Sequence, residues 1–435
     1  MHNKVGSNVK ILTPCSIDSD LSDIKKPELK VVGTFGRTFR QNFLLNEKYL
    51  ILNHGSFGTT PKYVEEYVEY YSRCSEYNID KWMDQTIRPM IYNSLERIAP
   101  YMGVQDSTQL TYVQNSTTAV STALRGLSFE AGDVIFKFNT TYNACSNAVK
   151  YICDTTKAEL FDITLNFPMT DEEIINATTD AINKVKQDSS KRVRFALIDA
   201  IISVPGIVLP YHEITAEFKK VGALVFIDAA HSLGMIDLNI DSLGCDYFVT
   251  NAHKWFYSKR GCAIFYVANK NKTSTHPLVI SHSYAPECEF GESFLWQGTI
   301  DFSTYLSSNA AIDFIEAVGG LKSIQSYCRN LVHQATELYQ NKYNFIPLTN
   351  EKSQIANFVN MIIPNLEYGN PKHDKIGYEL KNTILTRHNA SGVFYPHNGH
   401  WNIRLSAQIF VDLDDFDNYG KIIVETIKQE LNELS

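Results

Sequence analysis

Two runs of sequence decide the fold: Ala-Leu-Val-Phe-Ile-Asp-Ala-Ala-His at residues 223–231 and Asp-Tyr-Phe-Val-Thr-Asn-Ala-His-Lys-Trp at residues 246–255. Each contains a short apolar stretch of the kind that forms a strand buried on both faces. Asp228 ends the first stretch and Lys254 follows the second. Open α/β sheets bind their ligands at the carboxyl ends of such strands. We therefore expect Asp228 and Lys254 to share one ligand site.

The segments around these runs alternate between predicted strands and predicted helices. Apolar strands are expected at 133–138, 195–201, 223–228, 246–250 and 262–267, with amphipathic stretches such as 170–187 and 211–221 between them. This order predicts a mostly parallel sheet flanked by helices. Beyond residue 300 we expect a long helix near 304–341, short strands near 343–347, 355–363, 392–396 and 401–406, and a closing helix near 413–434.

The length of 435 residues exceeds the usual size of a single core, so two domains are expected. Residues 1–32 are rich in Ser, Asp, Lys and Pro and are predicted to be a flexible arm. Residues 33–300 are predicted to form a large domain together with its N-terminal segment. Residues 301–435 are predicted to form a smaller α+β C-terminal domain.

Composition excludes several classes of function. The net charge of −8 gives no basic surface for nucleic acid. No apolar stretch approaches the roughly 20 residues that span a bilayer, and the N-terminus lacks the apolar core of a signal peptide. The eight cysteines show no Cys-x-x-Cys spacing, which is typical of a reduced compartment and implies no metal site. We expect a cytoplasmic protein without nucleic-acid or membrane partners.

The pairing of Asp228 with Lys254 indicates pyridoxal phosphate (PLP) held as a lysine Schiff base. The PLP ring accepts electrons well only while its pyridine nitrogen stays protonated, and a buried carboxylate keeps it so. A partly buried lysine beside a cation is acidified, which suits it to imine formation and proton transfer. Alone, such an Asp is more often a helix cap and such a Lys more often solvated. His231 and His253 at matching offsets favour the cofactor.

Several motifs together resemble the fold type I PLP enzymes, and within them the class V aminotransferase superfamily. The closest likeness is to isopenicillin N epimerase-like proteins and to fungal hercynylcysteine sulfoxide lyases of ergothioneine synthesis. It implies a large domain with a mostly parallel, seven-stranded-type sheet and a smaller C-terminal domain. The motifs are Leu52-Asn-His-Gly-Ser-Phe-Gly, Ile202-Ser-Val-Pro-Gly, Asn251-Ala-His-Lys-Trp, Trp296-Gln-Gly-Thr-Ile-Asp and Ile403-Arg-Leu-Ser-Ala-Gln.

The cofactor phosphate is expected at Ser116, Thr117 and Thr118, because hydroxyls and free amides at a helix start bind anions. An ordinary Ser/Thr helix cap is the alternative. The resemblance adds Asn251 and His253 to this cradle. It also implies a homodimer in which Thr299 reaches the phosphate of the neighbouring subunit.

The ring and the substrate have their own expected partners. By the resemblance, Tyr142 stacks on the ring as a further catalytic residue, and His231 contacts the ring oxygen or its carboxylate partner. A surface tyrosine and a packed histidine are the alternatives. Arg404 lies in a predicted buried strand and offers the planar fork that an α-carboxylate needs. Asn53 lies in a turn-rich run and is the second predicted substrate residue; Gly55 and Gly58 there are expected to let backbone approach a ligand.

The expected reaction begins when the substrate amine displaces Lys254, which then removes the Cα proton. A leaving group on Cβ gives β-elimination, so a cysteine-derived amino acid would yield pyruvate and ammonia. The substrate would then be hercynylcysteine sulfoxide or, as in a cysteine desulfhydrase, cysteine. Reprotonation on the opposite face would make the protein an epimerase. A non-catalytic PLP-binding regulator is a further alternative.

Two further features bear on the substrate. Cysteine desulfurases need a nucleophilic cysteine shortly before the carboxylate arginine, but none lies between Cys328 and Arg404, where Phe394-Tyr-Pro-His-Asn-Gly-His stands instead. A trimethylammonium substrate would need aromatic faces. The candidates for these faces are Trp82, Trp296, Trp401 and several tyrosines.

Overall fold

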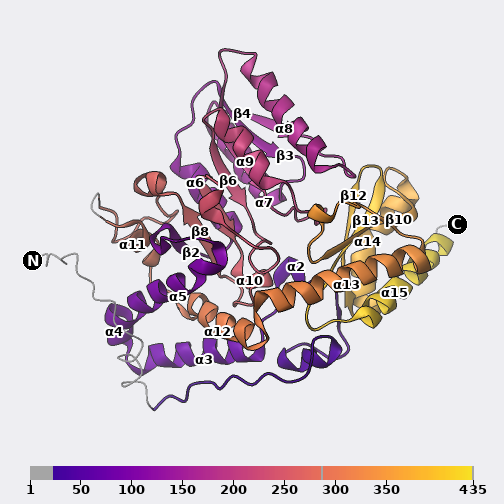
Figure 1. Ribbon diagram of the computed structural model, residues 1–435, viewed down its shortest axis with the longest axis horizontal. Coiled ribbons are helices and arrows are strands. Elements are labelled where there is room, and N and C mark those ends of the chain that lie inside the picture. Colours follow the sequence, from indigo (N-terminus) through magenta and orange to yellow (C-terminus); the bar gives the residue numbers. More distant parts are fainter. Residues whose placement is uncertain (1–22, 286–287, 434–435) are drawn as a thin grey trace, which may run out of the picture.

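The computed structural model describes residues 23–285 and 288–433 (Figure 1). Its centre is a seven-stranded sheet with strand order β2-β8-β7-β6-β5-β3-β4, in which β8 runs antiparallel to its neighbours β2 and β7. The mostly parallel sheet predicted from the sequence is therefore confirmed. The strands are β2 (Leu110–Val113), β3 (Asp133–Phe138), β4 (Glu159–Ile163), β5 (Arg192–Asp199), β6 (Leu224–Asp228), β7 (Tyr247–Thr250) and β8 (Ala263–Val267).

Helices cover both faces of this sheet, which explains why its inner strands are apolar without alternation. Along β3, Val134 and Phe136 belong to one buried cluster and Ile135 to another, so successive side chains enter different cores. The first core includes residues of α8 (Asp171–Lys186) and α9 (Tyr211–Lys220). The second includes residues of α6 (Ser116–Gly126), α7 (Asn143–Thr155) and α11 (Phe290–Leu295).

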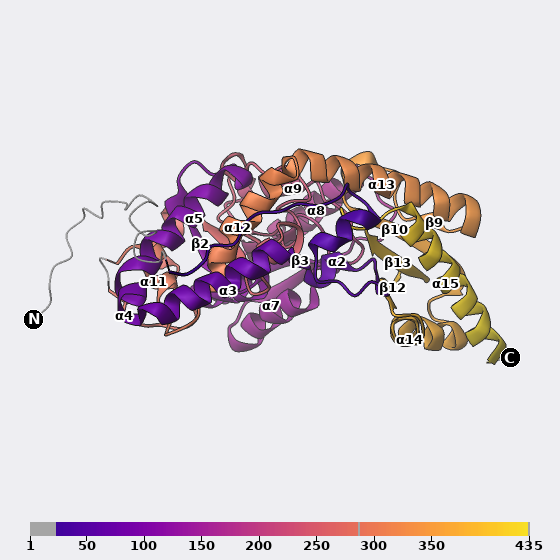
Figure 2. The same ribbon diagram turned by 90° about the horizontal axis from the view of Figure 1, so that it is seen from below.

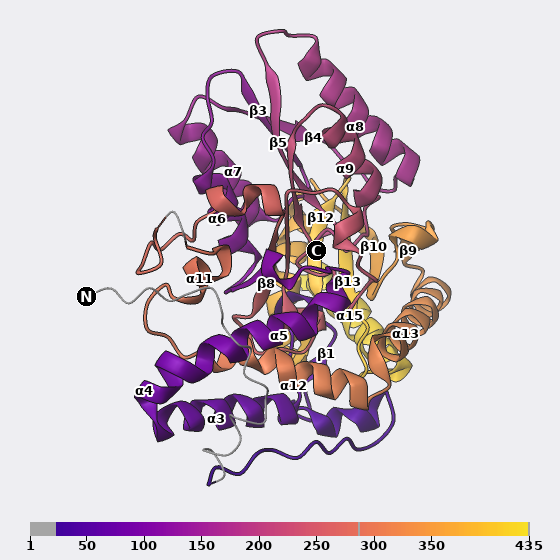
Figure 3. The same ribbon diagram turned by 60° about the vertical axis from the view of Figure 1, so that its left-hand side comes forward.

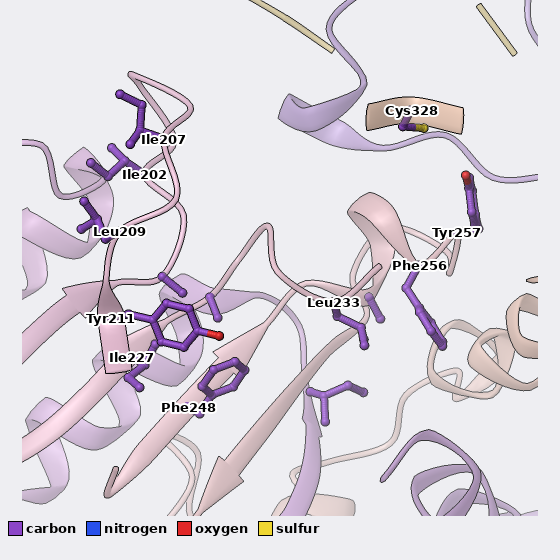
Figure 4. Close-up of a cluster of buried hydrophobic side chains, with 14 of the residues drawn as sticks. Ile202, Ile207, Leu209, Tyr211, Ile227, Leu233, Phe248, Phe256, Tyr257 and Cys328 are labelled. Atoms are coloured by element: carbon purple, nitrogen blue, oxygen red, sulfur yellow. The ribbon is translucent and has the colours of Figure 1, made fainter. Parts of the chain in front are cut away.

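The first core continues beneath the carboxyl ends of β6 and β7. Figure 4 shows Ile227 and Phe248 on these strands, with Tyr211 of α9 beside them. The same cluster extends through Leu233 to Tyr257, which follows Lys254, and to Cys328 in α13 (Gly320–Tyr343). The segment that carries Lys254 therefore packs against buried side chains from several parts of the chain.

An N-terminal helical layer lies along one side of the sheet. α12 (Ser303–Ala317) packs against α3 (Lys62–Tyr77) and α5 (Ile87–Met102), and the three helices lie together in all three views (Figures 1, 2 and 3). The short helical elements that precede α11 in the chain are η1 (Arg37–Asn42), α2 (His54–Phe57), α4 (Ile79–Lys81), η2 (Trp82–Thr86), η3 (Ser107–Gln109), η4 (Ile240–Ser242), α10 (Ala252–Trp255) and η5 (Asn269–Ser274).

A four-stranded antiparallel sheet in the order β12-β13-β10-β9 forms the centre of the C-terminal part. The strands are β9 (Ile346–Pro347), β10 (Phe358–Glu367), β12 (Val393–His397) and β13 (His400–Ser406), and a short helix η6 (Lys352–Gln354) precedes β10. Asn398 and Gly399 join β12 to β13 with φ values of 47° and 78°, as a two-residue hairpin turn with two positive φ angles requires. This smaller domain also confirms the fold prediction.

The helices of this part differ from the prediction in two places. The helix expected at 304–341 is two helices, α12 and α13 (Gly320–Tyr343), because Gly319 and Gly320 have φ of 97° and 80° and break the helical path. α14 (Pro371–His388) was not predicted, since it buries only Ile376, Gly377, Leu380 and Ile384 and its apolar pattern is weak. The closing helix is α15 (Leu413–Glu433), as expected.

The N-terminal segment is tied to the C-terminal part by backbone pairing. β1 (Leu50–Ile51) runs parallel to β11 (Ala390–Ser391). Of the predicted arm, residues 1–22 lie outside the described residues, while Ile24 and Leu29 pack against the main core. The domain division at residue 300 stays a prediction. No helix in the described ranges has the length and apolarity needed to cross a membrane.

Candidate functional site

A cavity of about 620 Å³ opens at the carboxyl ends of β5, β6 and β7, next to the start of α6. Asp228 and Lys254 both line it, as the two opening runs of sequence predicted. Seven further predicted residues line it as well: Ser116, Thr117, Thr118, Tyr142, His231, Asn251 and His253. The geometry gathers these side chains, while their individual roles stay predictions.

Lys254 projects from α10, the single helical turn that follows β7. Its Nζ lies 3.3 Å from Nε2 of His231. His54 Nε2 lies 2.7 Å from the Lys254 carbonyl oxygen, to which it donates. Burial, followed by the positive charge of Arg404, lowers the Lys254 pKa to about 8, and Asp228 opposes this shift. Roughly a tenth of Lys254 is therefore the neutral amine at pH 7, far more than for an ordinary lysine.

Gly55 and Gly58 bring the turn-rich run against the segment that carries Lys254, while their approach to a ligand stays a prediction. A Cβ on Gly58, whose φ is 68°, would lie 1.8 Å from the carbonyl oxygen of His253. A Cβ on Gly55 would overlap the ring of Phe358. The two glycines let this segment pass directly behind the turn that carries Lys254.

Asp228 is buried at the end of β6, where its partners carry no positive charge. Its carboxylate accepts from the amide of Ala230 at 3.1 Å and from the thiol of Cys145 at 3.3 Å. Asp199 is its register partner on β5 and accepts from the Thr141 hydroxyl at 3.0 Å. Burial raises the pKa of both carboxyls, and the charge of Asp228 raises that of Asp199 further.

Two buried carboxyls that form no ion pair are costly unless a ligand supplies the positive charge. A protonated pyridine nitrogen is such a group, so this end of the cavity fits the PLP ring. Sequence reasoning found Asp228 but missed Asp199, Thr141 and Cys145. The apolar run that ends in Asp199 carried the same signal as the run that ends in Asp228.

The start of α6 also lines the cavity. Asn251 Oδ1 accepts from the Ser116 amide at 3.0 Å and from its hydroxyl at 3.1 Å, so Asn251 orients this helix start. Asn115 caps the helix by accepting from the Thr118 amide at 2.9 Å. A helix start with hydroxyl side chains suits a phosphate.

His253 donates from Nδ1 to the Cys262 carbonyl at 2.9 Å, and burial lowers its pKa to about 4. Its Nε2 is therefore an acceptor in the neutral ring. A contact with a bound phosphate would require the ring to gain a proton, which the phosphate charge itself favours.

Arg404 lies beside this site, on the wall of a second cavity of about 610 Å³ that shares Ser56, Tyr142 and Ser203 with the first. Its Nη2 donates to Ser56 Oγ at 3.1 Å and to Asn53 Oδ1 at 3.4 Å, and its Nη1 donates to the Ser203 carbonyl. The guanidinium also lies 4.5 Å above the ring of Phe358.

Arg404 is only 2% exposed, and burial lowers its pKa to about 10. Its Nε has no hydrogen-bond partner among the described residues. A buried cation whose partners are neutral is expected to gain an anionic ligand, and a planar fork suits a carboxylate. Arg404 and Asn53 therefore lie together where a substrate carboxylate would bind.

The aromatic residues that line the cavity are not the tryptophans named from the sequence. Trp82 and Trp401 are buried in the main core and Trp296 packs on Phe302, so none of the three lines the cavity. Phe57 and Tyr142 line it instead and are 65% and 51% exposed. The structure places Thr299 on the surface after α11, away from this cavity.

Comparison with known proteins gives the family of the chain. The family described as Aminotransferase class-V matches residues 53–373. An L-cysteine desulfhydrase-like protein of Epichloe uncinata is 25% identical over 69% of this chain and 70% of its own length. The hercynylcysteine sulfoxide lyase of Schizosaccharomyces pombe is 25% identical over 90% of this chain and 97% of its own length.

Other relatives match more narrowly. A putative L-cysteine desulfhydrase of Oryza sativa subsp. japonica matches over 59% of its own length. The isopenicillin N epimerase of Amycolatopsis lactamdurans is 25% identical over 66% of this chain and 75% of its own length. The predicted resemblance to epimerases and sulfoxide lyases is confirmed by these matches.

Solved structures show the same fold. A cystine C-S lyase in complex with cysteine persulfide superposes with a TM-score of 0.72 at 18% identity, covering 86% of this chain and 97% of that one. A cysteine desulfurase from Thermococcus onnurineus superposes with a TM-score of 0.72 at 16% identity, covering 92% of this chain and 100% of that one. The fold type I architecture is confirmed.

The site, the fold and the family match agree on one class of protein, an enzyme that uses PLP. The chain belongs to the class-V aminotransferase family. Its cofactor is PLP. The roles of Lys254 as covalent anchor, of Asp228 as partner of the ring nitrogen and of the start of α6 as phosphate cradle stay predictions.

Proposed function

We propose that this enzyme is a carbon-sulfur lyase that acts by β-elimination on an S-substituted cysteine and releases pyruvate and ammonia. The observation that carries the proposal is the gathering of Lys254, Asp228 and Arg404 around two adjoining cavities. When bound, PLP accepts the electron pair left at the substrate Cα. Lys254 takes the Cα proton, Asp228 holds the proton of the ring nitrogen, and Arg404 anchors the α-carboxylate.

The thiols of the described chain favour a lyase over a persulfide-forming desulfurase. The β12–β13 hairpin turns tightly at Asn398 and Gly399, where a mobile cysteine loop would be needed. Cys145 is the thiol at the site, but it is fully buried and burial raises its pKa strongly. A protonated, inaccessible thiol is not a nucleophile, so the sulfur of the substrate leaves with its substituent.

The second cavity supports a substrate larger than free cysteine. It begins at Arg404 and Tyr142 and is otherwise mostly polar. Its polar lining includes Lys137, Asn139, Thr140, Thr141 and Lys150. A polar substituent on sulfur fits there, and the exposed rings of Phe57 and Tyr142 offer faces to a quaternary ammonium. These features support hercynylcysteine sulfoxide as the substrate.

A product assay tests the reaction. The PLP-loaded enzyme is incubated in deuterated water with L-cysteine, S-methyl-L-cysteine and hercynylcysteine sulfoxide, and pyruvate is measured. Pyruvate from the sulfoxide, absent in Lys254→Ala and retained in the surface control Lys322→Ala, is the expected result. Deuterium at Cα with inversion and no pyruvate would identify an epimerase. Formation of the PLP absorbance band without exchange or pyruvate would identify a non-catalytic regulator.

We also propose a homodimer in which Thr299 of each copy completes the phosphate cradle of the other. Thr299 and Ile300 are exposed and lie outside the cavity of their own chain. Nearby in sequence, Leu278, Val279 and Ile280 are exposed apolar residues that a partner could bury. Light scattering is expected to give twice the chain mass, and Thr299→Val is expected to weaken PLP binding. A monomer with full PLP affinity would contradict the dimer.

A further inference from the structure

The buried Trp255 and His231 and the partly buried Lys254 form a hydrogen-bonded row at the cofactor site. The indole Nε1 of Trp255 donates to Nδ1 of His231 at 3.2 Å. On the other side of the same ring, Nε2 of His231 lies 3.3 Å from Nζ of Lys254. Trp255 directly follows Lys254 in sequence, so one helical turn supplies both ends of the row.

The chemistry of the groups fixes the direction of these hydrogen bonds. An indole N–H only donates, so Nδ1 of His231 must accept with its lone pair. Burial and then the charge of Lys254 lower the His231 pKa well below its usual value, so the ring is neutral. A neutral imidazole has one N–H, which must then be on Nε2. This N–H donates to Lys254 Nζ, and only a neutral amine has a lone pair to accept it.

We propose that Trp255 is a positioning residue that fixes His231 as the Nε2–H tautomer and thereby holds Lys254 as the neutral amine that captures PLP. The proposal rests on covalent capture of PLP by Lys254. It holds for any substrate and for either reaction outcome.

Packing around the row leaves Trp255 little freedom. The rings of Trp255 and His231 both meet the ring of Phe358 edge-on, with centroids 5.4 Å and 5.3 Å from it. Gly234 approaches so closely that a Cβ there would lie 2.3 Å from the Trp255 carbonyl oxygen. The indole N–H is therefore held in its direction toward His231 by its surroundings.

Other charged and titratable groups act on the same amine and limit how much the row alone can change. Arg404 on β13 disfavours the ammonium form, while Asp228 on β6 and Cys145 on α7 favour it. His54 and His253 act on the His231 ring. Removing the indole donor should consequently move the titration of Lys254 only part of the way back to that of an ordinary lysine.

The test follows PLP capture by the full-length apoenzyme as a function of pH, using the absorbance of lysine-bound PLP. In the wild type the rate is expected to rise with pH to a midpoint near 8. In Trp255→Phe, His231 can adopt the Nδ1–H tautomer and accept from the Lys254 ammonium. We expect the midpoint to rise by about one pH unit, so that capture at pH 7 slows about tenfold while the plateau at high pH is kept.

The matched control is Trp401→Phe, which removes an indole that is also buried and that donates to Asp374 at 3.0 Å. Its midpoint should equal that of the wild type. A packing defect alone would lower the capture rate at every pH without moving the midpoint. An unmoved midpoint in Trp255→Phe would overturn the proposal.

A second comparison tests the role of the tautomer. His231→Leu can neither donate to Lys254 nor accept from Trp255 or Lys254, so adding Trp255→Phe to it should not move the midpoint further. A shift as large as in the wild-type background would contradict the proposal. Nitrogen NMR of the ¹⁵N-histidine-labelled wild-type apoenzyme reads the tautomer directly, with the His231 signals assigned by their loss in His231→Leu. An Nδ1–H ring there would refute the proposal even if Trp255→Phe failed to fold. Absence of pyruvate in the product assay would leave these outcomes unchanged.

Discussion

Arg404→Lys separates the charge of the proposed carboxylate site from its shape. The substitution keeps a cation on β13 but removes the planar pair of donors. In the structure Nη2 donates to Ser56 and Asn53, while Nη1 donates to the Ser203 carbonyl. A lysine ammonium donates from a single point and cannot hold these contacts together with both oxygens of a carboxylate.

The size of the effect follows from the hydrogen bond that is lost. A hydrogen bond to a charged group contributes about 1.5–3 kcal/mol, and 1.36 kcal/mol corresponds to a tenfold change in rate. Loss of one of two such bonds predicts a fall in kcat/KM of roughly 10- to 150-fold. The α-carboxylate is bound equally in the ground state and the transition state, so the loss should appear in KM, with kcat nearly unchanged.

The assay couples pyruvate release to lactate dehydrogenase over a range of substrate concentrations. Arg387→Lys is the matched control, since Arg387 is a half-exposed arginine paired with Glu430 on the surface. The pH midpoint of PLP capture should be kept in Arg404→Lys, because the positive charge near Lys254 remains. An unchanged KM, or a loss confined to kcat, would refute the assignment of Arg404 to the substrate carboxylate.

Three further substitutions test the carboxyl pair and the glycine behind Lys254. Asp228→Asn should still capture PLP but lower kcat for pyruvate release by roughly 100-fold or more, since an amide cannot keep the ring nitrogen protonated. Because the pKa of Asp199 is raised in the folded state, its contribution to stability is full below pH 3.8 and is lost as pH rises through the folded-state pKa. The free energy of unfolding of the apoenzyme, measured by chemical denaturation, should therefore depend less on pH in Asp199→Asn. If Asp199→Asn kept the wild-type dependence of the unfolding free energy on pH, the raised pKa of Asp199 would be contradicted. Gly58→Ala should lower the free energy of unfolding by roughly 3 kcal/mol or more, because its Cβ meets the His253 carbonyl. Gly222→Ala has a similar φ of 76° with nothing within 4 Å and should cost only about 1–2 kcal/mol.

The inner strands were predictable because a strand that is buried on both faces has a continuous apolar run in its sequence. β3 was predicted with its observed ends, 133–138. β4 was missed because it is an edge strand whose first four residues are partly or fully exposed, so it lacks that run. α14 was missed because much of its surface faces solvent. In both cases tertiary packing stabilises an element that local apolar pattern does not mark.

A site residue was predictable from the sequence when its residue type is seldom needed at a strand end for structural reasons alone. Asp228 and Lys254 meet that condition, and the structure brings them to one cavity. Trp255 and Phe57 do not, because aromatic residues are usually core residues and their roles depend on which way they point. The contact between Asn53 and Arg404 depends on the pairing of β1 with β11, which only the folded chain shows.

That pairing also limits when the site can form during synthesis of the chain. Asn53 and Arg404 are 351 residues apart in the chain, and the Gly55 amide donates to Ser406 across the same distance. At about 5–20 residues per second, a ribosome needs roughly 20–70 s to make the intervening chain. Lys254 emerges midway, before the strand that carries Arg404 exists. The proposed carboxylate site at Arg404 and Asn53 is thus completed only after the C-terminal strands are made, and a nascent chain stalled before residue 404 should lack it.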